Sequence, residues 1–146
     1  MDESINLLVK IKQEFDCKDV DLRTYSPLTL AFLGDCVYDI IIRTVVVERG
    51  NRAPQGLHKK KSYLVNAKTQ KELIESIQDL LTEEEESVYR RGRNAKSYTT
   101  AKNASVGDYR KATGFEALLG YLYLDDKMDR VMYLIKEGLN RIGAEI

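Results

Sequence analysis

The chain has 146 residues, 43% of them hydrophobic, and its 23 Lys and Arg balance 23 Asp and Glu, so the formal net charge is zero. Two prolines and no Gly/Ser-rich or repetitive tract exclude a low-complexity protein and favour one domain over residues 1–146. Two cysteines, no secretory signal and no apolar run long enough to span a bilayer argue against a secreted or membrane protein, so we expect free thiols and a cytoplasmic location.

A short amphipathic helix and a long apolar helix are expected in the first third of the chain. The short helix covers about residues 5–11, and a loop over 16–25 follows it. Ser26 and Pro27 are typical of an N-cap and a first helical residue. The helix that they open should run to about Arg49.

The long helix is apolar on nearly all sides, which indicates burial on most of them. A chain of this length can hardly surround such a helix, so we expect part of it to face a second subunit. The alternative is a strand over 40–47, where β-branched residues gather. Because no turn signal separates this run from the Ser-Pro start, we expect a helix.

The remaining helices are recognised by their capping signals and apolar periodicity. Nothing in this part of the chain indicates a strand, so the sequence predicts an all-α fold with about seven helices. The expected elements are a loop over 51–56, a basic helix over 57–68, a helix opened by a Thr69–Glu72 capping box, a helix from a Thr82–Glu85 capping box to about Arg91–Gly92, a basic loop over 93–104, a helix from Ser105–Asp108 to about Leu124, and a last amphipathic helix over 128–142.

Two acidic residues stand at the centres of apolar helical segments. Asp35 lies in Leu-Gly-Asp-Cys-Val within the long helix, and Glu116 lies in Gly-Phe-Glu-Ala-Leu further along the chain. A lone buried carboxylate is costly unless a cation or several donors compensate it. We therefore expect the two helices to face one another across a shared cation. The alternative is a pair of acids satisfied by Lys, Arg or backbone donors.

The chemistry of the candidate ligands narrows the choice of cation. Oxygen ligands favour Mg²⁺, with Mn²⁺ as a substitute, over zinc. The single histidine, His58, leaves neither a His-based catalytic triad nor a His-rich zinc site. Asp39 falls one turn after Asp35 on the same face, where it is either an auxiliary group of the site or the first exposed acid of that face.

Two stretches concentrate positive charge despite the neutral total. Residues 52–71 hold six Lys or Arg and no acid, and residues 87–111 hold seven against Asp108 alone. Charge runs are ordinarily solvated surface, but two of them beside a carboxylate pair favour a polyanion backbone as partner. Without aromatic interleaving for stacked single-stranded bases, a duplex fits better. The candidate RNA-binding residues are Lys59, Lys60, Lys61, Arg91, Arg93, Asn94 and Lys96.

Two motifs resemble a known family. Residues 30–38, Leu-Ala-Phe-Leu-Gly-Asp-Cys-Val-Tyr, resemble the signature helix of the ribonuclease III catalytic domain. Residues 115–124, Phe-Glu-Ala-Leu-Leu-Gly-Tyr-Leu-Tyr-Leu, resemble its second acidic motif. The stretches 57–60, 83–86 and 91–96 resemble the short bacterial form of that family, Mini-ribonuclease III, which has no separate double-stranded-RNA-binding domain.

This resemblance implies an all-helical, homodimeric endoribonuclease that cleaves double-stranded RNA with Mg²⁺, in the maturation of large-subunit (23S) ribosomal RNA. It implies that Asp35 is the essential catalytic acid and Glu116 its metal-binding partner. Full-length ribonuclease III has further acids at the positions of Ala31 and Thr113. We therefore expect waters and RNA phosphates to complete the metal shell.

Two other functions are compatible with the same residues. One is a non-catalytic RNA-binding or ribosome-assembly protein on the same fold, and the other is a helical interaction module without an RNA role. A further partner compatible with the sequence is an accessory ribosomal protein that presents the RNA to the enzyme.

Overall fold

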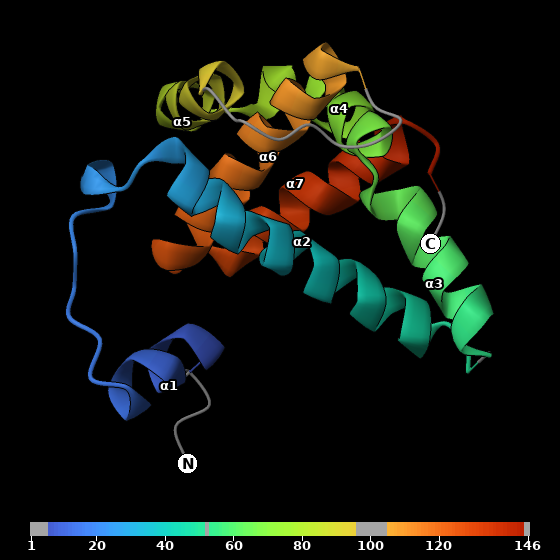
Figure 1. The fold of residues 1–146 in the computed structure, drawn as a ribbon, viewed down its shortest axis with the longest axis horizontal. Helices are drawn as coiled ribbons and strands as arrows, with labels where there is room; N and C mark the ends of the chain where they lie inside the picture. Colours follow the sequence, from blue (N-terminus) through green and yellow to red (C-terminus); the bar gives the residue numbers. More distant parts are fainter. Residues whose placement is uncertain (1–5, 52, 96–104, 145–146) are drawn as a thin grey trace.

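A computed structural model describes residues 6–51, 53–95 and 105–144. In this part of the chain there are seven α-helices, two short 3-10 helices and no strand, which confirms the all-α prediction (Figure 1). None of these helices combines the length and apolar content needed to cross a membrane. The elements are α1 (Leu7–Glu14), η1 (Leu22–Thr24), α2 (Pro27–Glu48), α3 (Pro54–Val65), α4 (Ala67–Ser76), η2 (Gln78–Leu80), α5 (Glu83–Asn94), α6 (Val106–Leu124) and α7 (Met128–Arg141).

Three of the predicted helix starts are confirmed by their caps. The Ser26 hydroxyl accepts the Thr29 backbone N–H at 3.2 Å, and Pro27 opens α2. The Thr82–Glu85 capping box is complete at the start of α5, and Ser105 caps α6. Helix α2 continues without a break through residues 40–47, so the strand alternative is wrong.

The region between α2 and α5 differs from the prediction. Helix α3 begins at Pro54 and ends at Val65, and the Asn66 side chain caps α4 by accepting the Thr69 N–H at 2.8 Å. Thr69 is buried, and its hydroxyl donates to the Tyr63 carbonyl instead. The predicted Thr69–Glu72 capping box is therefore wrong, because an earlier residue supplies the cap.

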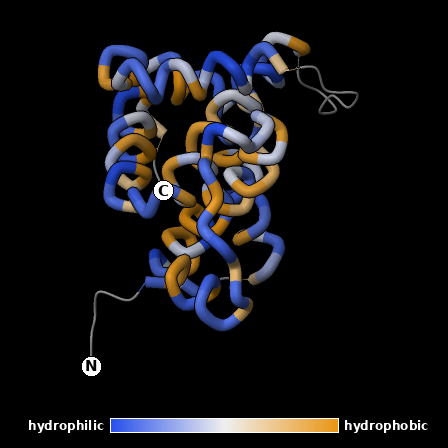
Figure 2. The backbone as a smooth tube through the Cα atoms, turned by 90° about the vertical axis from the view of Figure 1, so that its left-hand side faces the viewer, coloured by the Kyte–Doolittle hydropathy of each residue, from blue (hydrophilic) through white to orange (hydrophobic). Residues whose placement is uncertain are grey.

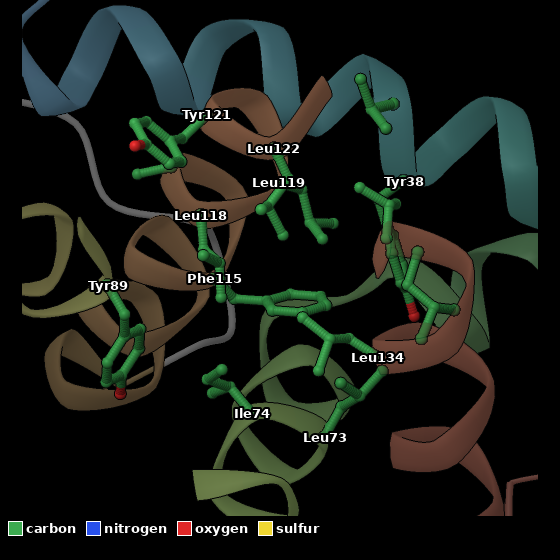
Figure 3. Close-up of a cluster of buried hydrophobic side chains, with 14 of the residues drawn as sticks. Tyr38, Leu73, Ile74, Tyr89, Phe115, Leu118, Leu119, Tyr121, Leu122 and Leu134 are labelled. Atoms are coloured by element: carbon green, nitrogen blue, oxygen red, sulfur yellow. The ribbon is translucent and has the colours of Figure 1, made fainter. Parts of the chain in front are cut away.

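Helix α6 occupies the centre of the fold, packing on α2, α4, α5 and α7. Phe115 of this helix is fully buried, and its ring meets the Tyr38 ring edge to face at 5.6 Å. The Tyr38 hydroxyl donates to the Leu64 carbonyl at 2.7 Å, which ties α2 to α3 through the core. In Figure 3 the Phe115 ring lies among side chains of three neighbouring helices, Tyr38, Leu73, Ile74 and Leu134.

Candidate active site

Helices α2 and α6 touch backbone to backbone where the two acidic motifs lie. A Cβ atom at Gly34 would stand 1.7 Å from the Glu116 carbonyl oxygen, and one at Gly120 would stand 2.0 Å from the Leu30 carbonyl oxygen. Only glycine fits at either position, which explains a residue of poor helix propensity in the middle of each helix. The close approach sets Asp35, next to Gly34, against Glu116.

The two carboxyl groups are close enough to change each other's ionisation. Burial, then a hydrogen bond with Asp35, then repulsion from its charge raise the pKa of Glu116 to about 9. The Asp35 residue is exposed and Glu116 is partly buried, so the pair opens to solvent on the Asp35 side. A divalent cation between the carboxylates would offset both the burial and the repulsion, so this donor set fits the expected Mg²⁺.

Few other side chains near Asp35 and Glu116 could serve as metal ligands. Ala31 and Thr113 are both buried, and the Thr113 hydroxyl donates to the Tyr109 carbonyl at 3.0 Å. Among the residues that the structure describes, no three His, Cys, Asp or Glu side chains gather into a metal-binding group. Two carboxylates with water and phosphate oxygens would suit Mg²⁺, which ordinarily keeps several waters.

Protein stability measured without metal tests whether burial and Asp35 disfavour the charged form of Glu116. Below pH about 4.5 the Glu116 carboxyl holds its proton in the folded and unfolded states, and between about 4.5 and about 9 only the folded state holds it. The contribution of Glu116 to the unfolding free energy therefore falls as pH rises through this window. In EDTA at pH 8, we expect Glu116→Gln to exceed wild type in unfolding free energy by ~1 kcal/mol or more.

Urea unfolding of both proteins from pH 5 to 9 measures this difference, which should widen with pH. Glu72→Gln, at an exposed position of α4, is the matched control and should follow wild type. A Glu116→Gln protein that is less stable than wild type at pH 8 would contradict the raised pKa of Glu116 in the folded protein.

Asp39 has two cationic partners. Its carboxylate lies 2.8 Å from Nε of Arg43, one turn along α2, and 3.7 Å from Nζ of Lys61 on α3. Asp39 thus links α3 to α2. The Arg43 spacing was visible in the sequence, but the pairing with Lys61 depends on where α3 folds.

The basic end of α5 packs on the segment of α6 that carries Glu116. A Cβ atom at Gly92 would stand 2.8 Å from Ala117 Cβ and 2.9 Å from Gly114 Cα, so this turn packs on residues that precede and follow Glu116 in α6. Arg91 and Asn94 are exposed on the same turn. The Arg93 guanidinium lies 5.7 Å from the Tyr89 ring centre, and its Nε donates to Asn94.

A hollow of about 470 Å³ separates the end of α5 from the start of α2. Arg90, Arg91 and Asn94 line it together with Pro27. Arg90 was not among the predicted RNA-binding residues, although the charge count included it.

Lys96 lies outside the described residues. Helix α5 also runs two residues beyond its predicted end at Arg91–Gly92, so Arg93 and Asn94 are helical.

The three lysines of α3 lie away from this cluster. Lys61 pairs with Asp39. Lys60 and Lys61 are both partly buried, whereas Lys59 is exposed to solvent. Helix α3 packs near the C-terminal end of α2, and α5 lies near its N-terminal end (Figure 1). Among the described residues of one chain, the lysines of α3 and the cations of α5 therefore do not form one patch.

Comparison with known proteins agrees with this geometry. Residues 28–127, which include α2, α6 and both acids, match the Ribonuclease III domain. The chain therefore belongs to the ribonuclease III family.

Within this family it is similar to proteins named Mini-ribonuclease 3. The one from Thermoanaerobacter sp. is 51% identical over 76% of this chain and 78% of its own length. The one from Enterococcus faecalis is 45% identical over 84% of this chain and 95% of its own. An X-ray structure of a protein from Fusobacterium nucleatum superposes with a TM-score of 0.75 at 34% identity, covering 84% of this chain and 98% of that one.

Proposed function

We propose that this protein is a Mg²⁺-dependent endoribonuclease that cleaves double-stranded RNA, with large-subunit (23S) ribosomal RNA precursor as its substrate. The observation that carries the proposal is the contact of Asp35 and Glu116 on two helices held together by glycine. Family membership and the names of the relatives support it. Mn²⁺ is expected to support the same activity when it is supplied in place of Mg²⁺.

Each group has a separate part in phosphodiester hydrolysis. A bound Mg²⁺ supplies Lewis-acid stabilisation of phosphate charge and makes water a better nucleophile. Asp35 and Glu116 would hold it from two helices whose backbones are in direct contact at Gly34 and Gly120. Rigid placement of such groups supports catalysis by keeping the reacting atoms aligned. The cations at the end of α5 would hold the RNA backbone beside the carboxylates.

The cationic end of α5 gives a prediction about salt dependence. Replacing Arg91 and Arg93 by Gln should weaken duplex binding and reduce the slope of log K against log salt by about one to two, because fewer counterions are released. Filter binding of a duplex RNA between 50 and 300 mM KCl measures the slope. Lys127→Gln, on an exposed site between α6 and α7, is the control. An unchanged slope in the double variant would place the RNA on another surface.

The outer face of α2 supports the expected homodimer. Leu28, Phe32 and Ile40 line one side of the helix, and Phe32 is 80% exposed and Ile40 60% exposed. Cys36, between them, is an exposed free thiol. A row of exposed apolar side chains of this kind favours a protein interface. A two-fold dimer would carry one carboxyl pair per subunit and could cut both RNA strands.

Phe32→Glu is expected to convert the dimer to monomers, because it would bury a charge in the interface. Sedimentation equilibrium gives the mass directly. Ser62→Glu, which adds the same charge at an exposed site of α3, should leave the mass unchanged. Equal masses for wild type and Phe32→Glu would rule out this face of α2 as the dimer interface.

The substrate is tested with protein-free precursor of large-subunit ribosomal RNA in Mg²⁺ and in EDTA. Cleavage only with Mg²⁺ supports the proposal, and it also shows that no accessory ribosomal protein is required. Duplex binding without cleavage under any divalent ion would favour the non-catalytic RNA-binding function instead.

A further inference from the structure

Helix α1 lies outside the residues that match the family, and one chain provides little packing for it. Figures 1 and 2 both place it at the lower end of the molecule, and Figure 1 shows it apart from the helices around α6. Leu8 is its one buried residue, and the preceding Asn6 side chain donates to Asp126 at the turn between α6 and α7. An eight-residue helix is only marginally stable in water, so α1 depends on another surface.

One side of α1 carries an apolar stripe that its own chain leaves open. Leu7, Ile11 and Phe15 are spaced four residues apart, which places them along one side of the helix. Leu7 is 66% exposed and Phe15 is 77% exposed. The stripe is therefore a free apolar surface about two helical turns long.

An apolar groove of about 770 Å³ runs between the C-terminal half of α2 and helix α7. Ile41 and Val45 form its α2 wall, and Met132, Tyr133 and Leu139 contribute from α7. Met132 and Tyr133 are both about half exposed. Ile40, on the exposed face of α2, and Ile41, in the groove, are consecutive residues, so their side chains point about 100° apart around the helix and the groove lies to one side of the proposed dimer face rather than on it.

We propose that α1 of each subunit packs its stripe into the α2–α7 groove of the other subunit, so that the helices form exchanged arms around the dimer. This inference rests on the proposed homodimer. When a two-fold axis crosses α2 at right angles, the N-terminal half of one α2 meets the C-terminal half of the other. Helix α1 precedes the N-terminal half of its own α2, and the groove borders the C-terminal half of the partner helix.

Charge supports the same pairing. The groove carries the cations Arg49 and Lys136 and one acid, Glu137, which pairs with Arg141. The acids Glu14 and Asp16 flank Phe15 at the end of the α1 stripe. Opposite charges at the edge of an apolar contact favour the correct orientation of the two surfaces more than they add affinity.

Dimer dissociation constants test the arm. Phe15→Glu places a charge on the stripe, and Gln13→Glu adds the same charge on the opposite side of α1. We expect Phe15→Glu to raise the dimer dissociation constant by at least about tenfold, as for a buried aromatic interface residue, and Gln13→Glu to leave it unchanged. Sedimentation velocity over a concentration series measures both constants.

The native thiol Cys17, two residues after Phe15, allows a direct positional test. In a Cys36→Ser background, Lys136→Cys adds a second thiol at the groove. Mild oxidation should then give a covalent dimer on a non-reducing gel, well above the amount formed by Cys36→Ser alone. A covalent monomer would show that α1 folds onto the groove of its own chain and would overturn the exchange.

The two proposals fail in different ways. Wild-type protein that is monomeric at all concentrations would refute the homodimer, and with it the arm. A wild-type dimer that Phe15→Glu and Gln13→Glu affect equally, with no added cross-linking through position 136, would refute the arm and leave the dimer standing.

Discussion

Asp35→Asn is expected to reduce cleavage of duplex RNA by at least ~10³-fold, because the variant would lose one of the two charged ligands of the proposed metal ion. Binding of the duplex should stay within about threefold of wild type, since the proposed contacts with the RNA backbone are those of the α5 cations. Single-turnover cleavage and filter binding with the same RNA separate the two effects.

Asp129→Asn is a suitable control, because Asp129 is exposed at the start of α7, away from the α2–α6 contact. It should cleave like wild type. An Asp35→Asn protein with full activity would remove the mechanism, and one that also loses RNA binding would show that Asp35 has a structural part in the binding surface.

Gly34→Ala is expected to cause the largest loss of stability, about 3 kcal/mol or more, because its Cβ would meet backbone rather than a flexible side chain. The added atom would lie 1.7 Å from the Glu116 carbonyl oxygen and 2.9 Å from the Gly120 backbone nitrogen. Helices α2 and α6 would have to separate, which would also part Asp35 from Glu116. Urea unfolding measures the stability, and the cleavage assay shows the loss of the site.

Gly107→Ala provides the matched control within α6. Its Cβ would meet only the Ser105 hydroxyl at 3.9 Å, so the variant should be as stable as wild type or slightly more stable. If Gly34→Ala unfolds at the same urea concentration as Gly107→Ala, the two helices are not in the close contact that positions the carboxylates.

Local signals in the sequence predicted the helix starts that depend on neighbouring residues. Ser26, Thr82 and Ser105 cap the helices that follow them because each cap is formed within three residues. Thr69 was a false signal of the same kind. Asn66 also fits a cap there, and the choice between them depends on the burial of Thr69 against the rest of the fold.

Ion pairs between residues far apart in the sequence could not be predicted from the sequence. The four glutamates at the start of α5 lie where negative charge favours the helix dipole, but Glu85 is also buried and holds the Arg130 guanidinium of α7 at 2.8 Å. Arg130 is one of many cations in the chain, and nothing local marks it as the partner. The pairing of Lys61 with Asp39 is of the same kind.

The carboxyl pair itself was predictable in outline. An acid inside each of two apolar helices indicated a shared site, and the structure brings Asp35 and Glu116 together. The mid-helix glycines were the sequence signal for how this happens, because Gly34 and Gly120 allow the backbones to touch. The separation of the two basic stretches was not predictable, since it depends on the directions in which α3 and α5 leave the core.

Anomalous diffraction from a crystal grown with Mn²⁺ measures the position of the divalent ion most directly. We predict a strong peak within coordination distance of one carboxylate oxygen of Asp35 and one of Glu116, and its loss in crystals of Glu116→Gln. Ordered Mn²⁺ bound elsewhere on the protein, with none between these two side chains, would contradict the assignment of the active site.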